Sequence, residues 1–530
     1  MRRAIPILIV VIAAAVAGLA WAISSPIGSS PDEDYHLASI WCPPPVESSG
    51  CRVQTDAQGT TTVTVNARVA AAPGCYAFYP DNSAACIWAI PADMTVNDGR
   101  YDRGEYPAGF YRVMHFFAGA DPYTSVYAMR AFNLALAIVL GALLVVAATR
   151  PTRRILAYAV ASTYVPMGMF IVPSANPSSW AVIGVTTAAF ALHSYWMAES
   201  RSRVIVNGSL AAVGVGLASS ARADAALYAI LAAVALTCLH YCSVQRHLVR
   251  LVLPVGIVVV GLIAFRMSSQ AEAALSGSIG SSDASGGWRL LFANIVNIPD
   301  VLVGNQGLGN LGWLDTPMPP TVYVPTIMVC AFLLMAGVAR LSWMKALVAG
   351  AGILVLVALP LCILQVSHLV VGEGMQPRYI LPLLPVVSLV LLTGYRPDQA
   401  VRLSRPIAWF TWALVSGANG VALMSNIRRY TTGMDGSMMP GRAIEWWTPG
   451  APGPLATWIL GSLGFAVAAW MVVRLSTGRD VPIAVAATGD QTAIAPASPA
   501  QPSLTPTQQV VGAEPAHVAD SSDDTPVRQV

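Results

Sequence analysis

The chain has 530 residues, of which 55% are hydrophobic and only 11% are charged, and its mean hydropathy is +0.59. Soluble domains carry about 25% charged residues, so this composition excludes an ordinary soluble protein and predicts an all-α polytopic membrane protein. The formal net charge of +3 is too small to indicate a nucleic-acid partner.

About twelve apolar segments approach the roughly 20 residues that a helix needs to cross a lipid bilayer. They occupy residues 4–23, 126–148, 155–173, 178–197, 204–219, 225–242, 250–266, 323–339, 346–368, 379–394, 406–424 and 455–474. Basic residues concentrate in cytoplasmic loops, and Arg2 and Arg3 precede the first segment. With twelve spans every predicted inner loop is basic, so we expect a multi-pass protein of the plasma membrane with both termini in the cytoplasm.

These spans divide the chain into six parts. They are a first transmembrane helix at 1–23, an extracytoplasmic loop with a juxtamembrane helix at 24–125, helices two to seven at 126–266, a second extracytoplasmic loop at 267–322, helices eight to twelve at 323–476, and a disordered cytoplasmic tail at 477–530. The tail is rich in Ala, Pro, Thr, Gln and Asp without apolar periodicity, which is typical of disorder. The first helix could instead be a cleaved signal peptide, although its apolar run is long for one.

Residues 30–36, Ser-Pro-Asp-Glu-Asp-Tyr-His, directly follow the first predicted span and hold three carboxylates and an imidazole. The serine and Glu33 have the spacing of a capping box for a helix over 31–41. Asp32 and His36, four residues apart, would share one face of that helix. The pattern is typical of a solvated, well-capped acidic helix. The alternative is an active-site carboxylate pair, Asp32 and Glu33, at the membrane surface.

The first outer loop contains four cysteines, Cys42, Cys51, Cys75 and Cys86. An even number outside the membrane indicates two disulfides with three possible connectivities, of which sequential pairing is the simplest. A metal site is less expected, because no C-x-x-C motif or histidine at zinc spacing accompanies them. Residues 60–65, Thr-Thr-Thr-Val-Thr-Val, alternate as in a strand, so the loop is expected to hold a small hairpin.

Ionisable and polar side chains also gather near the predicted outer ends of later helices, where such groups are costly and usually functional. They include Arg130, Arg222, Asp224, Gln376, Arg378 and Tyr379. A guanidinium group binds phosphate through a planar fork of donors, and a carboxylate can take a proton from a hydroxyl group. Arginines beside the early carboxylates would therefore suit a phosphorylated lipid. The alternative for each arginine is a snorkelling side chain or a local ion pair.

Motifs in chain order resemble those of one family. They are Pro-Asp-Glu-Asp-Tyr-His at 31–36, Tyr-Pro-Ala-Gly-Phe-Tyr at 106–111, Arg-Ala-Phe-Asn at 130–133, Ser-Ala-Asn-Pro at 174–177, Gly-Trp-Leu-Asp-Thr-Pro at 312–317 and Gln-Pro-Arg-Tyr-Ile-Leu-Pro at 376–382. Together they resemble a bacterial family of polytopic membrane proteins, the domain of unknown function family 2142. Two positions depart from its pattern: Pro377 stands where glycine is expected, and Ser178 where aspartate is expected.

The family is similar to the GT-C superfamily of integral-membrane glycosyltransferases, which use polyprenyl-phosphate sugars. The resemblance implies a GT-C-like bundle with a large disulfide-bearing first loop, and transfer of a sugar from that donor to a cell-envelope glycan on the outer face. It implies that Asp32 or Glu33 is the base, or a ligand of a divalent metal such as Mg²⁺ or Mn²⁺, and that Arg222 and Arg378 hold the donor phosphate. The expected substrate-binding set is completed by His36, Arg130, Asp224, Gln376 and Tyr379.

Two other functions fit the same sequence. A transporter or flippase of a lipid-linked glycan would place charged residues along a path through the midplane of the membrane. A non-catalytic scaffold of an envelope-assembly complex would need no clustered carboxylates and arginines.

Overall fold

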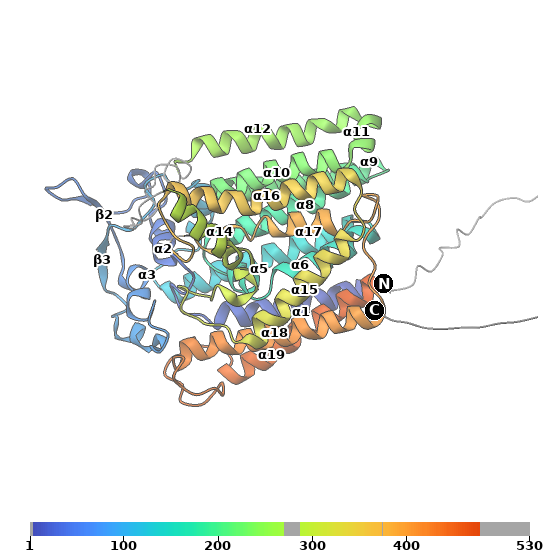
Figure 1. Ribbon diagram of the computed structural model, residues 1–530. Coiled ribbons are helices and arrows are strands. Elements are labelled where there is room, and N and C mark those ends of the chain that lie inside the picture. The colour runs from blue at the N-terminus through green and yellow to red at the C-terminus, as the bar shows by residue number, and fades with distance from the viewer. Residues whose placement is uncertain (1–3, 270–286, 374, 478–530) are drawn as a thin grey trace, which may run out of the picture. The chain divides into compact units, whose positions relative to one another are not determined.

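The structure is a computed structural model that describes residues 4–269, 287–373 and 375–477. These residues are mostly helical, and eight of their helices are long and apolar enough to cross a membrane. They are α1 (Ala4–Ile23), α5 (Pro122–Ala147), α9 (Arg201–Ala221), α12 (Val252–Met267) with the preceding turn η4 (Leu248–Leu251), α15 (Pro320–Val338), α16 (Trp343–Val366), α18 (Arg405–Thr431) and α19 (Pro454–Thr477). They run alongside one another as a bundle (Figure 1).

The other segments predicted as spans are shorter, interrupted or less apolar. They are α6 (Arg150–Thr163) with α7 (Met167–Ile171), α8 (Pro177–Trp196), α10 (Ala223–Leu239) and α17 (Leu384–Leu392). Proline explains the first interruption, because Pro166 lies between α6 and α7 and cannot donate a helical hydrogen bond. The described residues therefore contain eight candidate spans, and the full count of twelve stays a prediction. The predicted tail, 477–530, lies outside these residues except for Thr477, which ends α19.

Small residues let the central helices approach closely. α8 is buried along its whole length and packs mainly on α9. A Cβ atom added to Gly184 of α8 would lie 2.6 Å from the carbonyl oxygen of Gly214 of α9, a distance that no real side chain tolerates. Glycine at this crossing permits close contact between the two backbones. Such packing drives the association of helices in lipid, where the hydrophobic effect between helices is absent.

An antiparallel sheet caps one end of the bundle, which we call the sheet end (Figure 1). Its strands are β1 (Val53–Thr55), β2 (Thr61–Asn66) and β3 (Thr95–Asp98), in the order β1-β2-β3. β2 is the strand predicted from the Thr-Val alternation. Val63 and Val65 point into a second apolar core shared with Leu37, so the first loop is a folded cap.

Short helices complete the cap and the connections. They are α2 (Glu33–Trp41), η1 (Val46–Ser48), α3 (Ala67–Ala70), η2 (Pro73–Cys75), η3 (Ala84–Ala89), α4 (Gly109–His115), α11 (Tyr241–Arg246), α14 (Trp288–Val303), η5 (Gly304–Leu308) and η6 (Pro377–Tyr379). The helix predicted over 31–41 begins at Glu33, because Asp32 adopts a left-handed conformation with a φ of 60°. Glu33 Oε2 accepts the Ser30 backbone N–H at 3.2 Å, which is one half of the predicted capping box.

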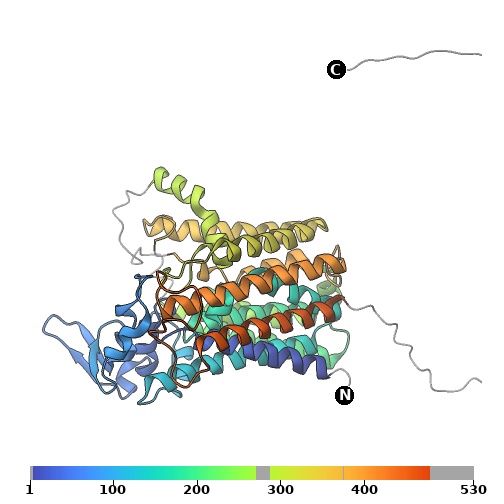
Figure 2. The same cartoon turned by 90° about the horizontal axis from the view of Figure 1, so that it is seen from below.

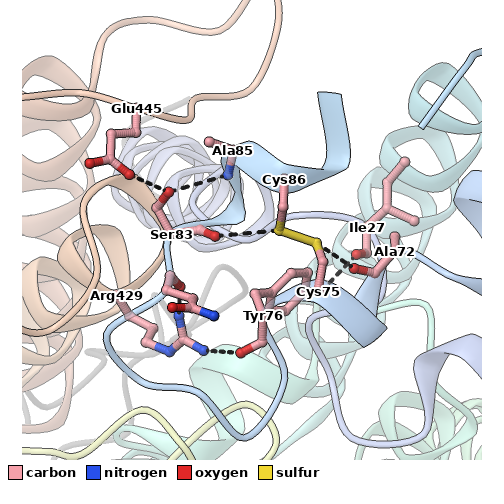
Figure 3. The surroundings of a disulfide bond; sticks show 10 residues. Ile27, Ala72, Cys75, Tyr76, Ser83, Ala85, Cys86, Arg429 and Glu445 are labelled. Carbon is pink, nitrogen blue, oxygen red and sulfur yellow. Dashed lines mark hydrogen bonds between the residues drawn. A yellow bond between two sulfur atoms is a disulfide. The ribbon is translucent and has the colours of Figure 1, made fainter. Parts of the chain in front are cut away.

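Two disulfides cross-link the cap internally, and a buried arginine ties the cap to the helices. The bonds join Cys42 to Cys51 and Cys75 to Cys86, which is the sequential pairing. Figure 3 shows the second bond beside Arg429 of α18, whose Nη2 donates to the Tyr76 carbonyl oxygen at 2.7 Å. The same nitrogen lies 2.7 Å from Asp315 Oδ2. Arg429 therefore ties α18 to both predicted outer loops.

Candidate functional site

Segments far apart in the sequence meet at the sheet end. The start of α2 supplies Asp32 and His36, the turn after β3 supplies Arg100, the junction of α9 and α10 supplies Arg222, and η6 supplies Arg378. We call these side chains and Tyr379 the Asp32–Arg378 cluster. Contacts link its members, and His36 is joined to Arg222 through the ring of Tyr106. The following paragraphs build it from its central carboxylate outward.

The carboxylate of Asp32 bridges two guanidinium groups. Arg378 Nη2 lies 2.6 Å from Oδ2, and Arg100 Nη2 lies 2.7 Å from Oδ1. Arg378 is buried and also donates to the Pro31 carbonyl oxygen at 3.0 Å, whereas the Asp32 side chain keeps 34% exposure. Burial alone would raise the pKa of Asp32, but the charges of the surrounding residues, foremost Arg378, hold it below its ordinary value. Asp32 is thus an ionised carboxylate that remains partly open.

Tyr379 lies between Arg222 and Arg378, the two arginines expected to bind the donor phosphate. The guanidinium carbon of Arg222 lies 4.9 Å from the ring centroid of Tyr379, and that of Arg378 lies 5.1 Å from the same centroid. Arg222 is buried and pairs with Asp224 through two bonds of 2.9 and 2.8 Å, the local ion pair considered as its alternative role. Both distances to the ring are within cation–π range, so two buried cations are neighbours here.

His36 is buried in a ring of tyrosines. Its Nδ1 lies 2.9 Å from the Tyr111 hydroxyl oxygen, and its ring centroid lies 5.2 Å from that of Tyr106. Burial holds the pKa of His36 well below its ordinary value, so the imidazole is neutral. Its Nε2 has no hydrogen-bond partner among the described residues, and the same is true of Gln376 Oε1. Buried polar atoms are rarely left unpaired, which marks both side chains as candidates for ligand contacts.

Glu33 and Arg130 have different surroundings. Both are buried, with Arg130 Nη2 3.1 Å from Glu33 Oε2. The other Glu33 oxygen accepts the Ala175 backbone N–H at 3.1 Å, and Arg130 donates to carbonyl oxygens in the turn after α1, including that of Pro26 at 2.7 Å. This geometry favours a structural role: the pair braces the turn after α1 against α5 and leaves Glu33 no free oxygen.

The expected metal site does not fit these residues. Both oxygens of Glu33 already accept hydrogen bonds from Arg130 and from backbone N–H groups, so Glu33 cannot share a cation with Asp32. Across residues 4–269, 287–373 and 375–477, no group of three or more His, Cys, Asp or Glu side chains could hold a metal ion.

A second acidic pair lies beside α2 and was not predicted. The Tyr35 hydroxyl group donates to Asp102 Oδ1 at 3.0 Å and to Glu105 Oε2 at 2.8 Å. Burial, together with the bond to Glu105, raises the pKa of Asp102 to about 7. Arg100 was missed as well. The sequence offers no signal for the acidic pair or for the contact of Arg100 with Asp32, because the segment 99–106 is an irregular connection whose position depends on tertiary packing.

A small hollow adjoins the structural pair. It is lined by Trp21, Ala22, Ser25, Ser29, Arg130, Phe170, Pro173 and Ser174, and the centre of a water-sized sphere can reach about 10 Å³ of it. That is room for about one water molecule, so this hollow is too small to hold a lipid-linked sugar.

Comparison with known proteins gives one match. A family model described as "Predicted membrane protein (DUF2142)" matches residues 16–387. No curated protein and no solved structure matches the chain. The matched range contains every residue of the Asp32–Arg378 cluster, both disulfides and the second acidic pair.

Proposed function

The chain belongs to the DUF2142 family of predicted membrane proteins, and we propose that it is a membrane glycosyltransferase. It would move a sugar from a polyprenyl-phosphate donor to a hydroxyl group of a cell-envelope glycan, on the outer face of the plasma membrane. One observation carries this proposal: a partly exposed carboxylate, Asp32, lies 2.6 Å from the buried guanidinium of Arg378, and Arg222 faces the same tyrosine ring.

The two arginines suit the donor phosphate. A guanidinium group offers a fork of donors that matches phosphate oxygens. Arg378 Nε has no hydrogen-bond partner among the described residues, and its Nη2 is bound only by a carboxylate that is itself one-third exposed. A phosphate group would therefore compete with Asp32 for Arg378, while Arg222 adds a second positive charge close by.

This competition would also prepare the base. The charges of Arg378 and its neighbours hold the pKa of Asp32 down, so neutralising Arg378 with phosphate makes Asp32 a stronger base. Asp32 then takes the proton of the acceptor hydroxyl as its oxygen attacks the anomeric carbon. The bond from that carbon to the phosphate oxygen breaks, the sugar is transferred with inversion, and polyprenyl phosphate leaves with its new charge stabilised by the arginines.

The remaining polar groups suit the sugar. His36 Nε2 and Gln376 Oε1 are unpaired within the described residues, and sugar hydroxyl groups can both donate and accept hydrogen bonds. The disulfides of the cap support an outer-face reaction, because such bonds persist in oxidising compartments outside the cytoplasm.

The proposal is tested by a transfer assay with the purified full chain in liposomes. A panel of radiolabelled polyprenyl-phosphate sugars is supplied with cell-envelope glycan, and labelled glycan is measured. We expect transfer from one donor by the wild type, and a loss of about a hundredfold or more in Asp32→Asn, the usual contribution of a general base. Asp34→Asn is the matched control, because Asp34 contacts Arg100 but not Arg378. Undiminished transfer by Asp32→Asn would refute the mechanism.

A further inference from the structure

One helix of the second predicted outer loop has a large apolar face that the described part of the chain leaves exposed. α14 spans Trp288–Val303, within the stretch 267–322 that the sequence assigned to the extracytoplasmic side, and it is not among the eight candidate spans. In two perpendicular views it runs obliquely to the long helices (Figures 1 and 2). Its surface divides into three sectors.

The first sector faces the protein. It consists of Leu290, Asn294, Ile298 and Val301, which recur every three or four residues and are all buried. Asn294 fixes the docking: its Nδ2 donates to the Leu369 carbonyl oxygen at 2.9 Å, and its Oδ1 accepts the Val371 N–H at 2.9 Å. α14 is thereby fastened to the segment that leads from α16 to η6.

The second sector is exposed and apolar. Trp288 is 84% exposed and Phe292 is 69% exposed, and Ile295, Val296 and Pro299 continue the same stripe. The third sector is exposed and polar, with Arg289, Asn297 and Asp300. At 100° per residue the exposed apolar stripe centres about half a turn from the buried face, and the polar residues lie between them on one side.

From these three sectors we infer that α14 is an interfacial helix whose apolar stripe inserts into the hydrocarbon boundary of the bilayer. A helix with protein on one face, apolar side chains on a second and charged side chains on a third fits the boundary between lipid and water. The neighbouring helix supports lipid as the occupant. α14 packs on α16, a candidate span that itself exposes apolar side chains such as Leu354 and Val366, so lipid around this span would also lie beside α14.

This placement would set the depth of the Asp32–Arg378 cluster. After α14 the chain continues into η5, where Asn305 Nδ2 donates to the Pro377 carbonyl oxygen at 2.8 Å. Pro377 begins η6 and precedes Arg378. A helix held in the membrane boundary therefore has a short, hydrogen-bonded connection to the arginine of the cluster. The inference does not depend on the proposed reaction, since it concerns only where α14 lies.

The test uses photo-crosslinking in the full chain. p-Benzoylphenylalanine is placed singly at Phe292 or Val296 on the apolar stripe, and at Asn297 or Asp300 on the polar sector. All four positions are exposed, so none of the replacements should disturb the docked face. The protein is reconstituted in phosphatidylglycerol–phosphatidylethanolamine liposomes, irradiated and analysed by mass spectrometry for covalent lipid adducts.

We expect lipid adducts at positions 292 and 296 in at least fivefold excess over those at 297 and 300. Equal yields at the four positions, or no adducts at 292 and 296, would overturn the inference. Protein–protein adducts at 292 and 296 in place of lipid adducts would also overturn it, because they would assign the stripe to a second copy of the chain.

Discussion

Asp32 and Glu33 are neighbours in the sequence, yet burial gives them opposite properties. Asp32 keeps a third of its side-chain exposure and contacts guanidinium groups from two distant segments. Glu33 is fully buried, with Arg130 and two backbone N–H groups around its oxygens. The left-handed backbone of Asp32, uncommon for a residue other than glycine, directs the two side chains to different partners.

Neutralising Glu33 should destabilise the protein. Removing one partner of a buried ion pair leaves an uncompensated charge and costs about 3–5 kcal/mol. In Glu33→Gln the amide would also present N–H donors to Arg130 and to the backbone donors around it. We expect a clear fall in the apparent melting temperature in nanodiscs, and little change for the partly exposed control Asp34→Asn. Equal melting temperatures for Glu33→Gln and the wild type would rule out the bracing role.

The pair Asp102–Glu105 should make stability depend on pH. The pKa of Asp102 is raised from 3.8 to about 7, so between these values the folded protein keeps a proton that the unfolded chain releases. Stability therefore falls as pH rises through this window, by at most about 1.4 kcal/mol per pH unit for one proton. Melting temperatures of the wild type and Asp102→Asn at pH 5 and pH 7 measure the effect. The difference in melting temperature between the two pH values should be smaller for Asp102→Asn than for the wild type. An equal difference in the two proteins would contradict the raised pKa of Asp102.

At the scale of elements, apolar runs predicted most helices but not their continuity. The runs behind α1, α5 and α16 reach the length that a bilayer requires, so their composition alone defines them. The run at 379–394 contains only the nine-residue helix α17, because the chain first forms the turn η6. The run at 155–173 is split at Pro166. A hydropathy window averages across such breaks and cannot detect them.

The candidate cluster was partly predictable for a similar reason. Asp32, Arg222 and Arg378 stand at the ends of predicted spans, so the predicted topology alone places them on one side of the membrane. The structure adds the contacts among these side chains. Arg100 and Asp102 could not be placed, because they lie in an irregular turn whose partners are more than sixty residues away. The buried contacts of Glu33 could not be predicted either, because one of its hydrogen-bond partners, the Ala175 backbone N–H, lies in a distant loop.

The disulfide between η2 and η3 should contribute measurably to the stability of the cap. It closes a loop with a sequence separation of 11, for which the chain-entropy model gives about 2–3 kcal/mol. Cys75→Ala with Cys86→Ala should therefore lower the apparent melting temperature. Cys238→Ala, which removes an exposed free thiol, is the control. A double variant as stable as this control would show that the bond adds nothing to the folded cap.

At the scale of the whole bundle, the distribution of arginines predicts that the sheet end faces outward. Gln58 is exposed in the turn between β1 and β2, and Glu199 is exposed in the connection from α8 to α9, at the other end of α8 from the cap. In intact cells a membrane-impermeant maleimide should label Gln58→Cys in a chain stripped of its free cysteines. Glu199→Cys should be labelled only after permeabilisation, and the reverse pattern would invert the predicted orientation.

The same scale joins the two proposals: an interfacial α14 would hold Arg378 at the depth where a lipid phosphate lies. The most direct test is the affinity of the reconstituted protein for a polyprenyl phosphate, compared among the wild type, Arg378→Gln and Asp32→Asn. Losing charge-assisted hydrogen bonds, worth about 1.5–3 kcal/mol, should weaken binding about tenfold or more in Arg378→Gln. Removing the competing carboxylate should instead tighten binding several-fold in Asp32→Asn. Equal affinities in the three proteins would contradict the account.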